Sequence, residues 1–197
     1  MSLPLSIDPH TSALLLMDFQ SFVLDNFLPP TAASEVVSNA SKLLGAARKV
    51  DMLTIHVTVG FRPGYPEISP RNKLFSGLKK NGMAALGSES TKIDSRLSPL
   101  NSEPVVVKHR IGAFSCTDLE RLLRARGIDT LILAGVTTAG VVLSTVRQAF
   151  DLDYALVVAS DGCMDPDEQA HAFVIERVLP QHANVLSADG IVSAVRP

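Results

Sequence analysis

The sequence predicts a single α/β domain in which a mainly parallel, doubly wound sheet lies between two layers of helices. Short apolar runs alternate with amphipathic segments of helical period along the whole chain. No break in composition divides its 197 residues. Strands and helices in strict alternation form right-handed crossovers, which place helices on both faces of a parallel sheet. We therefore expect one three-layer α/β/α domain, of Rossmann-like type, over residues 1–197.

The first half of the chain begins with a buried strand, a long helix and a second strand. The continuous apolar run at 12–18 is typical of a strand covered on both faces. Apolar residues recur at helical spacing in 32–50, and β-branched residues are frequent in 52–59. The next segment, roughly 60–103, is irregular and contains many Gly, Ser and Pro residues. A loop of this length usually covers or completes a site, although a solvent-exposed excursion also fits the pattern.

The second half of the chain continues the alternation. We predict strands and helices at 104–109 (strand), 117–126 (helix), 130–135 (strand), 139–151 (helix), 154–160 (strand), 166–179 (helix) and 183–188 (strand), with a last helical turn after them. Thr117 and Glu120 have the spacing of a capping box. Gly127 stands where a glycine commonly ends a helix.

Composition limits the class of protein. A net charge of −2, with 46% hydrophobic and 19% charged residues, indicates a globular chain and gives no reason to expect a nucleic-acid partner. The N-terminal segment has no basic region before its apolar run, and no stretch approaches the roughly 20 apolar residues that cross a bilayer. Two cysteines are too few for a disulfide framework. We expect a cytoplasmic protein with no membrane association.

Several motifs that identify enzymes are absent from the sequence. It contains neither G-x-G-x-x-G nor G-x-x-x-x-G-K-[ST], so the chain lacks the glycine-rich loops that bind the phosphates of dinucleotides and nucleoside triphosphates. No G-x-S-x-G elbow occurs, which argues against a serine hydrolase of the α/β type. The five histidines show no metal-ligand spacing. We therefore expect no metal and no cofactor.

Asp18 and Lys108 are the most informative polar residues, because each directly follows an apolar run. In an open parallel sheet the ligand lies outside the carboxyl ends of the strands, where both residues are expected. Isolated buried charges are costly, so we expect the two to pair. Such a pair can transfer a proton in a cleft, or it can be a purely structural ion pair; the residues alone leave both open.

With these residues the chain resembles the isochorismatase-like hydrolases, also called the cysteine hydrolases. The resemblance covers about residues 10–190 and rests on LLLMDFQ (14–20), VVVKHRIGAFSCTDLERLLRARGI (105–128), LILAGVTTAGVVLSTVRQAFDLDY (131–154) and VVASDGCMDPD (157–167). The family's catalytic triad is Asp, Lys and Cys, and Asp18 and Lys108 match the first two. The position of the cysteine nucleophile is occupied by Val141.

The resemblance implies a site without a thiol. Isochorismatases also lack the cysteine and hydrolyse a vinyl ether, with the aspartate as general acid; they carry Gly where this chain has Val141. By analogy Asp18 would donate the proton, Lys108 would hold charge, and backbone N–H groups near Val141 would bind negative charge. The expected contacts to a small, carboxylated substrate come from Gln20, Arg62, Arg110, Phe114, Val136 and Thr137. The family also commonly has a cis peptide, here Val136–Thr137, and commonly forms homo-oligomers, so a dimer or tetramer is expected.

Other residues are weaker candidates for the nucleophile. Cys116 precedes a helix and could lie near the pocket, whereas Cys163 fits a packing role, and Ser144 is expected to face away from the helix mouth. Three interpretations follow: a hydrolase that uses the Asp/Lys pair, a catalytically inactive binding protein, and an assembly protein on the same fold.

Overall fold

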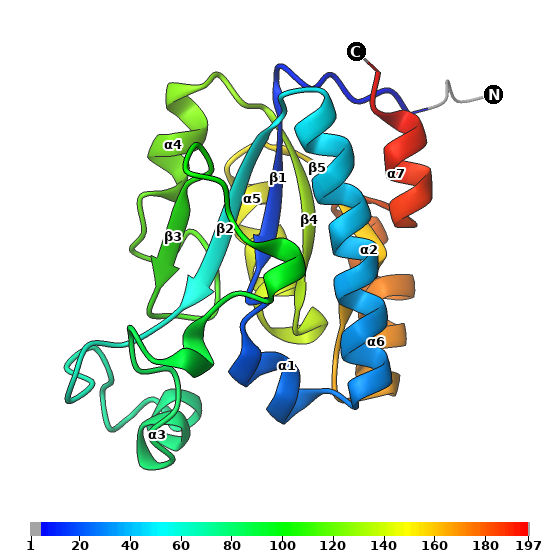
Figure 1. Ribbon diagram of the computed structural model, residues 1–197. Coiled ribbons are helices and arrows are strands. Elements are labelled where there is room, and N and C mark those ends of the chain that lie inside the picture. Colours follow the sequence, from blue (N-terminus) through cyan, green and yellow to red (C-terminus); the bar gives the residue numbers. More distant parts are fainter. Residues whose placement is uncertain (1–4, 197) are drawn as a thin grey trace.

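The computed structural model describes residues 5–196, and in that range six parallel strands form one sheet in the order β3-β2-β1-β4-β5-β6 (Figure 1). The doubly wound α/β fold expected from the sequence is confirmed. The strands are β1 (Ser12–Met17), β2 (Leu53–Val59), β3 (Val105–Lys108), β4 (Thr130–Val136), β5 (Ala155–Met164) and β6 (Asn184–Leu186).

Helices cover both faces of this sheet (Figure 1). They are α1 (Ser21–Phe27), α2 (Pro30–Lys49), α3 (Lys73–Lys80), α4 (Leu119–Ala125), α5 (Leu143–Asp151), α6 (Glu168–Phe173) and α7 (Ala188–Ala194), with short helical turns at Glu89–Thr91, Ser95–Leu97, Thr138–Val142, Val174–Val178 and Leu179–Gln181. Along β1, Leu14 and Leu16 join the core beneath α2 and α7, while Leu15 and Met17 join the core beneath α4 and α5. The continuous apolar run of β1 is therefore buried on both faces.

The strand order places a crevice between β1 and β4. After β1 the chain continues to β2 and β3 on one side, and after β4 it continues to β5 and β6 on the other. Loops that diverge in this way leave a ligand site outside the carboxyl ends of the two strands. Gly135 lets β4 approach β1 closely there, since a Cβ at this position would lie 2.8 Å from the carbonyl oxygen of Met17.

The structure differs from the sequence-based expectation at two helices. Helix α1 was not predicted, because its seven residues form fewer than two full turns and no side chain caps its N-terminus; Phe22, Val23 and Leu24 fix it by burial. Helix α3 lies inside the segment at 60–103 that was expected to be irregular, and Asn72 caps it by accepting from the Phe75 N–H at 3.1 Å.

Several element boundaries also move, and two of these shifts have a clear structural cause. Strand β5 runs to Met164 rather than to residue 160, because its register against β4 shifts between Leu133 and Gly135 and a bulge carries the strand onward. Helix α4 begins at Leu119, after the expected Thr117, whose hydroxyl accepts from the Leu119 N–H at 3.4 Å. Gly127 ends α4 with a φ of 64°, as predicted.

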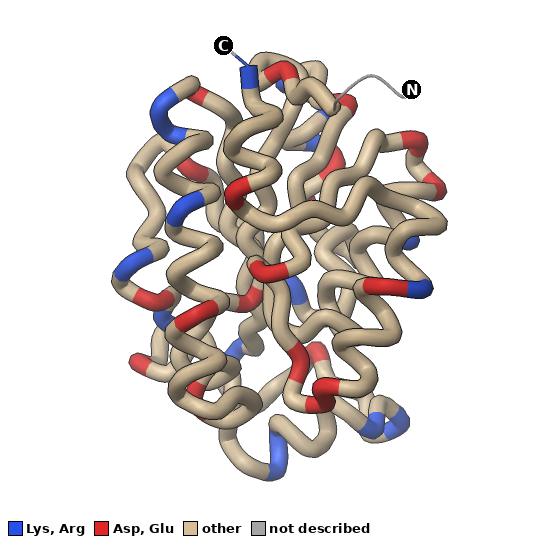
Figure 2. Tube along the Cα trace, turned by 90° about the vertical axis from the view of Figure 1, so that its right-hand side faces the viewer, with Lys and Arg blue, Asp and Glu red and all other residues tan. Residues whose placement is uncertain are grey.

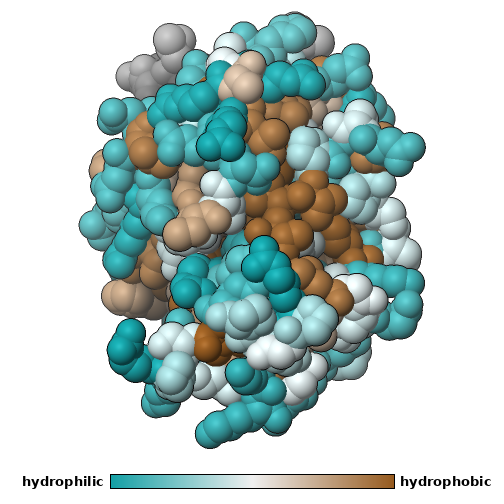
Figure 3. Space-filling view, turned by 90° about the vertical axis from the view of Figure 1, so that its left-hand side faces the viewer, coloured by the Kyte–Doolittle hydropathy of each residue, from teal (hydrophilic) through white to brown (hydrophobic). Residues whose placement is uncertain are grey.

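Two faces of the molecule differ in character. On the side that carries α2, α6 and α7, acidic and basic residues are interspersed along the trace (Figure 2). The opposite side, where β3 is the edge strand, shows a gathering of apolar side chains (Figure 3). Val105 and Val107 of β3 are 48% and 38% exposed there. Among residues 5–196, no helix is both long and apolar enough to span a bilayer.

Candidate active site

Asp18 directly follows β1 and turns its side chain into the crevice. Its N–H donates to the carbonyl of Val57 at 2.8 Å, which continues the β1–β2 ladder by one residue. Its φ of 60° then takes the backbone into the left-handed region, which Asp tolerates better than most residues. Carboxylate oxygen Oδ1 is buried and has no hydrogen-bond partner in the described structure. Burial outweighs the attraction of Lys108 and raises the pKa of Asp18.

Lys108, the last residue of β3, supplies the matching cation. Its Nζ lies 2.8 Å from Asp18 Oδ2 and donates to the carbonyl of Arg110 at 3.2 Å. An ammonium has three N–H donors, so one remains for a ligand. The structure therefore brings together the two residues that the sequence singled out, although β3 and β1 are separated by β2 in the sheet.

The turn after β4 forms the third side of the crevice. A single π-helical turn, Thr138–Val142, precedes α5, and the Val136–Thr137 peptide is cis. Asp165 Oδ2 accepts from the Ala139 N–H at 2.8 Å and fixes the start of this turn. First-turn N–H groups of a helix have no intrahelical partner, so those near Gly140 and Val141 are candidate donors to a bound ligand.

These three parts surround a cavity of about 140 Å³. Its floor consists of Asp18, Lys108 and the turn after β4, and its walls come from α1, α3 and the ends of β2 and β3. The cavity is lined by Asp18, Phe22, Val23, Phe27, Val59, Leu74, Phe75, Leu78, Lys108, Ile111, Val136, Thr137, Gly140 and Val141. Asp18 and Lys108 are the only charged residues of this lining in the described part of the chain.

Gln20 does not contact the cavity, contrary to expectation. Its side-chain oxygen accepts from the Val59 N–H at 2.8 Å. Its amide nitrogen donates to the carbonyl oxygens of Val59, at 3.1 Å, and Thr91, at 2.8 Å. Both amide hydrogens are thus used by the backbone, and the residue is 1% exposed. Gln20 joins the end of β2 to the turn at Glu89–Thr91.

The two arginines expected to bind a carboxylate also point elsewhere. Arg62 forms an ion pair with Glu67 at 3.0 Å, and its side chain is 67% exposed. Arg110 donates to the carbonyl of Glu67 at 3.2 Å and to that of His109. Phe114 is partly buried and packs against the core beneath α4 and α5, 6.0 Å from the ring of Tyr154. Of the six expected substrate contacts, only Val136 and Thr137 line the cavity in the described structure. The other four, Gln20, Arg62, Arg110 and Phe114, do not.

Val141 lines the cavity at the position where the resemblance places a cysteine, and neither cysteine of the chain does so. Cys163 is fully buried in β5, and burial raises the pKa of its thiol to about 12. Cys116 is exposed and precedes α4. Ser144 is also absent from the lining within the described residues.

Sequence reasoning missed the apolar walls of the cavity. Phe22, Val23 and Phe27 come from α1, and Leu74, Phe75 and Leu78 come from α3. The spacing of these residues in each segment, one face of a short helix, is the signal that could have found them. Both segments are too short to be recognised by periodicity alone.

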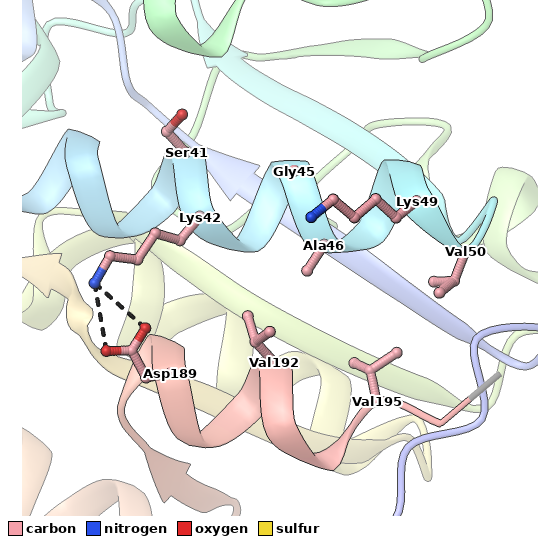
Figure 4. A pocket seen from close by; sticks show the side chains of 9 residues that line it. All are labelled: Ser41, Lys42, Gly45, Ala46, Lys49, Val50, Asp189, Val192 and Val195. Atoms are coloured by element: carbon pink, nitrogen blue, oxygen red, sulfur yellow. Dashed lines mark hydrogen bonds and ion pairs between the residues drawn. The ribbon is translucent and has the colours of Figure 1, made fainter.

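A larger depression lies elsewhere, between α2 and α7 (Figure 4). Its volume is about 470 Å³, but it is at the amino ends of the strands, beside the C-terminal half of α2. Its polar feature is an ion pair between Lys42 and Asp189 at 3.3 Å, and both side chains are largely exposed (Figure 4). Within residues 5–196 no group of three or more His, Cys, Asp and Glu side chains is arranged to hold a metal ion.

Comparisons with known proteins match nearly the whole chain. A family model described as the isochorismatase domain matches residues 12–190. The isochorismatase family protein YecD of Escherichia coli O157:H7 is 33% identical over 199 residues, which cover 97% of this chain and 100% of that protein. The ureidoacrylate amidohydrolase RutB of Agrobacterium fabrum is 27% identical over 217 residues, which cover 98% of this chain and 95% of that protein. A solved isochorismatase family protein from Burkholderia thailandensis superimposes with a TM-score of 0.84 at 26% identity, covering 98% of both chains.

Proposed function

The chain belongs to the isochorismatase family of hydrolases, and on this premise we propose that it hydrolyses a small molecule with the Asp18–Lys108 pair and without a cysteine nucleophile. The observation that carries the proposal is the unpartnered, buried Oδ1 of Asp18 in the lining of the cavity. A carboxyl group whose pKa is raised by burial retains its proton more readily, as a general acid requires.

In the proposed reaction, Asp18 transfers its proton to the terminal carbon of a vinyl ether, and a water adds to the resulting oxocarbenium ion. The hemiacetal or hemiketal then collapses to a carbonyl compound and an alcohol, and a proton returns to the Asp18 carboxylate. Lys108 compensates the negative charge that Asp18 carries in between, since its Nζ lies 2.8 Å from Oδ2. No side chain forms a covalent bond to the substrate, so a valine at position 141 is compatible with every step.

The absence of a cysteine nucleophile is part of the proposal. Val141 offers neither a lone pair nor a proton. Cys163 is buried, with the pKa of its thiol raised to about 12, so it holds little thiolate at neutral pH. Cys116 is exposed and lies outside the residues that line the cavity. A relative such as RutB is named for amide hydrolysis, but covalent amide hydrolysis requires a nucleophile that this cavity does not supply.

The test is a screen of vinyl ethers, amides and esters, with product formation followed by NMR. We expect turnover of a vinyl ether that falls on the order of 10²–10⁴-fold in Asp18→Asn. Asp25→Asn is the matched control, because Asp25 is an exposed carboxylate on α1 outside the cavity lining. Cys116→Ser and Cys163→Ala should each retain the activity. Turnover that survives Asp18→Asn, or that disappears with Cys116→Ser, would refute the proposal.

A binding protein without catalytic activity is the second candidate. Val141 favours it, because the family position of the nucleophile is filled by a hydrocarbon side chain. Ligand binding that is retained in Asp18→Asn, together with a screen that yields no turnover at all, would select this function.

We also propose that the chain forms a homo-oligomer, as the resemblance implies. Val105 and Val107 of edge strand β3 are exposed and give the molecule an apolar surface that a second copy could cover. Light scattering on the purified protein measures the oligomeric state directly. A molar mass equal to that of one chain, 21.0 kDa, would exclude the homo-oligomer.

A further inference from the structure

The walls of the cavity point to a chemical class of ligand. We propose that the ligand has one polar head, neutral or singly charged, beside Asp18 and Lys108, and an otherwise apolar, preferably flat body. The inference rests on the proposed function for the choice of this cavity as the ligand site, and it adds which chemical groups the ligand must carry.

The polar groups of the cavity lie together at its floor. Asp18 Oδ1 lacks a partner, and Lys108 has one N–H that the protein does not use. A single head that both donates and accepts hydrogen bonds, such as an amide or a carboxyl group, matches this pair. Backbone N–H groups near Gly140 and Val141 add donors on the same side.

The walls of the cavity are apolar and come mainly from two helices. Phe22 and Phe27 reach it from α1, and Phe75 reaches it from α3. Three aromatic rings in the lining favour a flat apolar body that they can contact face or edge on. Leu74 and Ile111 also line the cavity and are 54% and 39% exposed, so the entrance is apolar as well.

A second charged group on the ligand would have no counter-ion. Arg62 is held by the carboxylate of Glu67, and Arg110 by the carbonyl oxygens of Glu67 and His109. Lys108 already compensates Asp18. A carboxylate on the body would therefore lose its hydration against apolar side chains without a partner, which is costly. This geometry disfavours dicarboxylates and other doubly charged metabolites.

The test compares benzamide with succinamate, which share the amide head and differ in the body. Neither requires turnover, so an NMR titration of the intact protein separates binding from chemistry. We expect benzamide to bind at least about tenfold more tightly than succinamate. Leu74→Arg and Ile111→Arg should each weaken benzamide about fivefold or more and strengthen succinamate, because each places a cation at the entrance. Leu100→Arg is the matched control, since Leu100 is 51% exposed and lies outside the lining.

The outcomes separate this inference from the proposed function. Benzamide binding that depends on Leu74 supports the inference, even if Asp18-dependent turnover is never found. Succinamate that binds as tightly as benzamide, or benzamide binding that Leu74→Arg and Leu100→Arg weaken equally, overturns the inference and leaves the catalytic proposal standing. Failure of benzamide to bind at millimolar concentration also overturns it.

Discussion

Asp18 Oδ2 lies 2.8 Å from Lys108 Nζ, and both residues are almost completely buried, at 5% and 2% exposed. An ion pair in this position is costly to desolvate and gives little net stability by itself. Burial raises the pKa of Asp18 in spite of the neighbouring ammonium. Burial and the neighbouring ammonium thus act on the pKa of Asp18 in opposite directions, and opposing effects of this kind are common at functional sites.

Lys108→Met should add to the free energy of unfolding a component, due to Asp18, that falls as pH rises. Without the ammonium, the pKa of Asp18 in the folded protein rises further above its unfolded value of about 3.9. The folded state then binds this proton more tightly than the unfolded state, so the contribution of Asp18 to the free energy of unfolding is largest below about pH 4 and declines as pH increases through its folded pKa. Urea unfolding at several pH values measures this slope. The double variant Asp18→Asn/Lys108→Met should lose it, and an unchanged slope in the double variant would assign the effect to another group.

Val141→Cys should place a reactive thiol in the cavity. The new sulfur would stand at the start of a helix and near an ammonium, and both favour thiolate. We expect the pH profile of iodoacetamide alkylation, measured in a Cys116→Ser background, to give a thiol pKa below the usual value of about 8.5. Cys163 provides the internal comparison, because it is buried and the pKa of its thiol is raised to about 12. If the thiol introduced by Val141→Cys titrates like one in free solution, the cavity does not activate nucleophiles.

Gln20→Leu should destabilise the fold and leave ligand affinity unchanged. Leucine has similar volume but cannot accept from the buried Val59 N–H or donate to Thr91. Leaving these groups without partners costs on the order of 2 kcal/mol. Denaturant unfolding gives the stability change, and benzamide titration of the folded variant gives the affinity. If the variant instead loses affinity for benzamide while its stability stays normal, Gln20 contacts the ligand after all.

The sequence predicted the floor of the site because its residues follow long, regular strands. Asp18 and Lys108 end apolar runs, and parallel strands bring their carboxyl ends to one edge. It did not predict the walls, since α1 and α3 are too short to show a clear helical period, and burial of Phe22 and Phe75 contributes to their stability. It also could not predict that Glu67 would bind Arg110 as well as the nearby Arg62, because the contact to Arg110 depends on how the segment after β2 folds back. The contact between Arg110 and Glu67 joins residues 43 positions apart, which leaves no local signal in the sequence.

Glu103 ties three separate segments together away from the cavity. Its carboxylate accepts two hydrogen bonds from Arg48 of α2, at 2.7 and 2.8 Å, and one from the Leu100 N–H at 2.8 Å. It also lies 3.1 Å from the buried ring of His56 in β2. Together, the hydrogen bonds from Arg48, Leu100 and His56 overcome the opposing effect of burial and lower the pKa of Glu103 to about 2.

This cluster should make the protein less stable in acid. Because the folded pKa of Glu103 lies below its ordinary value of 4.5, its contribution to stability is complete above about pH 4.5 and is lost as pH falls towards 2. Burial also lowers the pKa of His56, so protonation of that ring acts in the same direction below about pH 6.5. Glu103→Gln should lower the free energy of unfolding at pH 7 by about 2 kcal/mol and flatten its decline between pH 4.5 and 2. Thermal unfolding across this range checks both effects. Glu89→Gln is the control, since Glu89 pairs with Lys92 at an exposed position, and equal pH profiles for the two variants would contradict the role of Glu103.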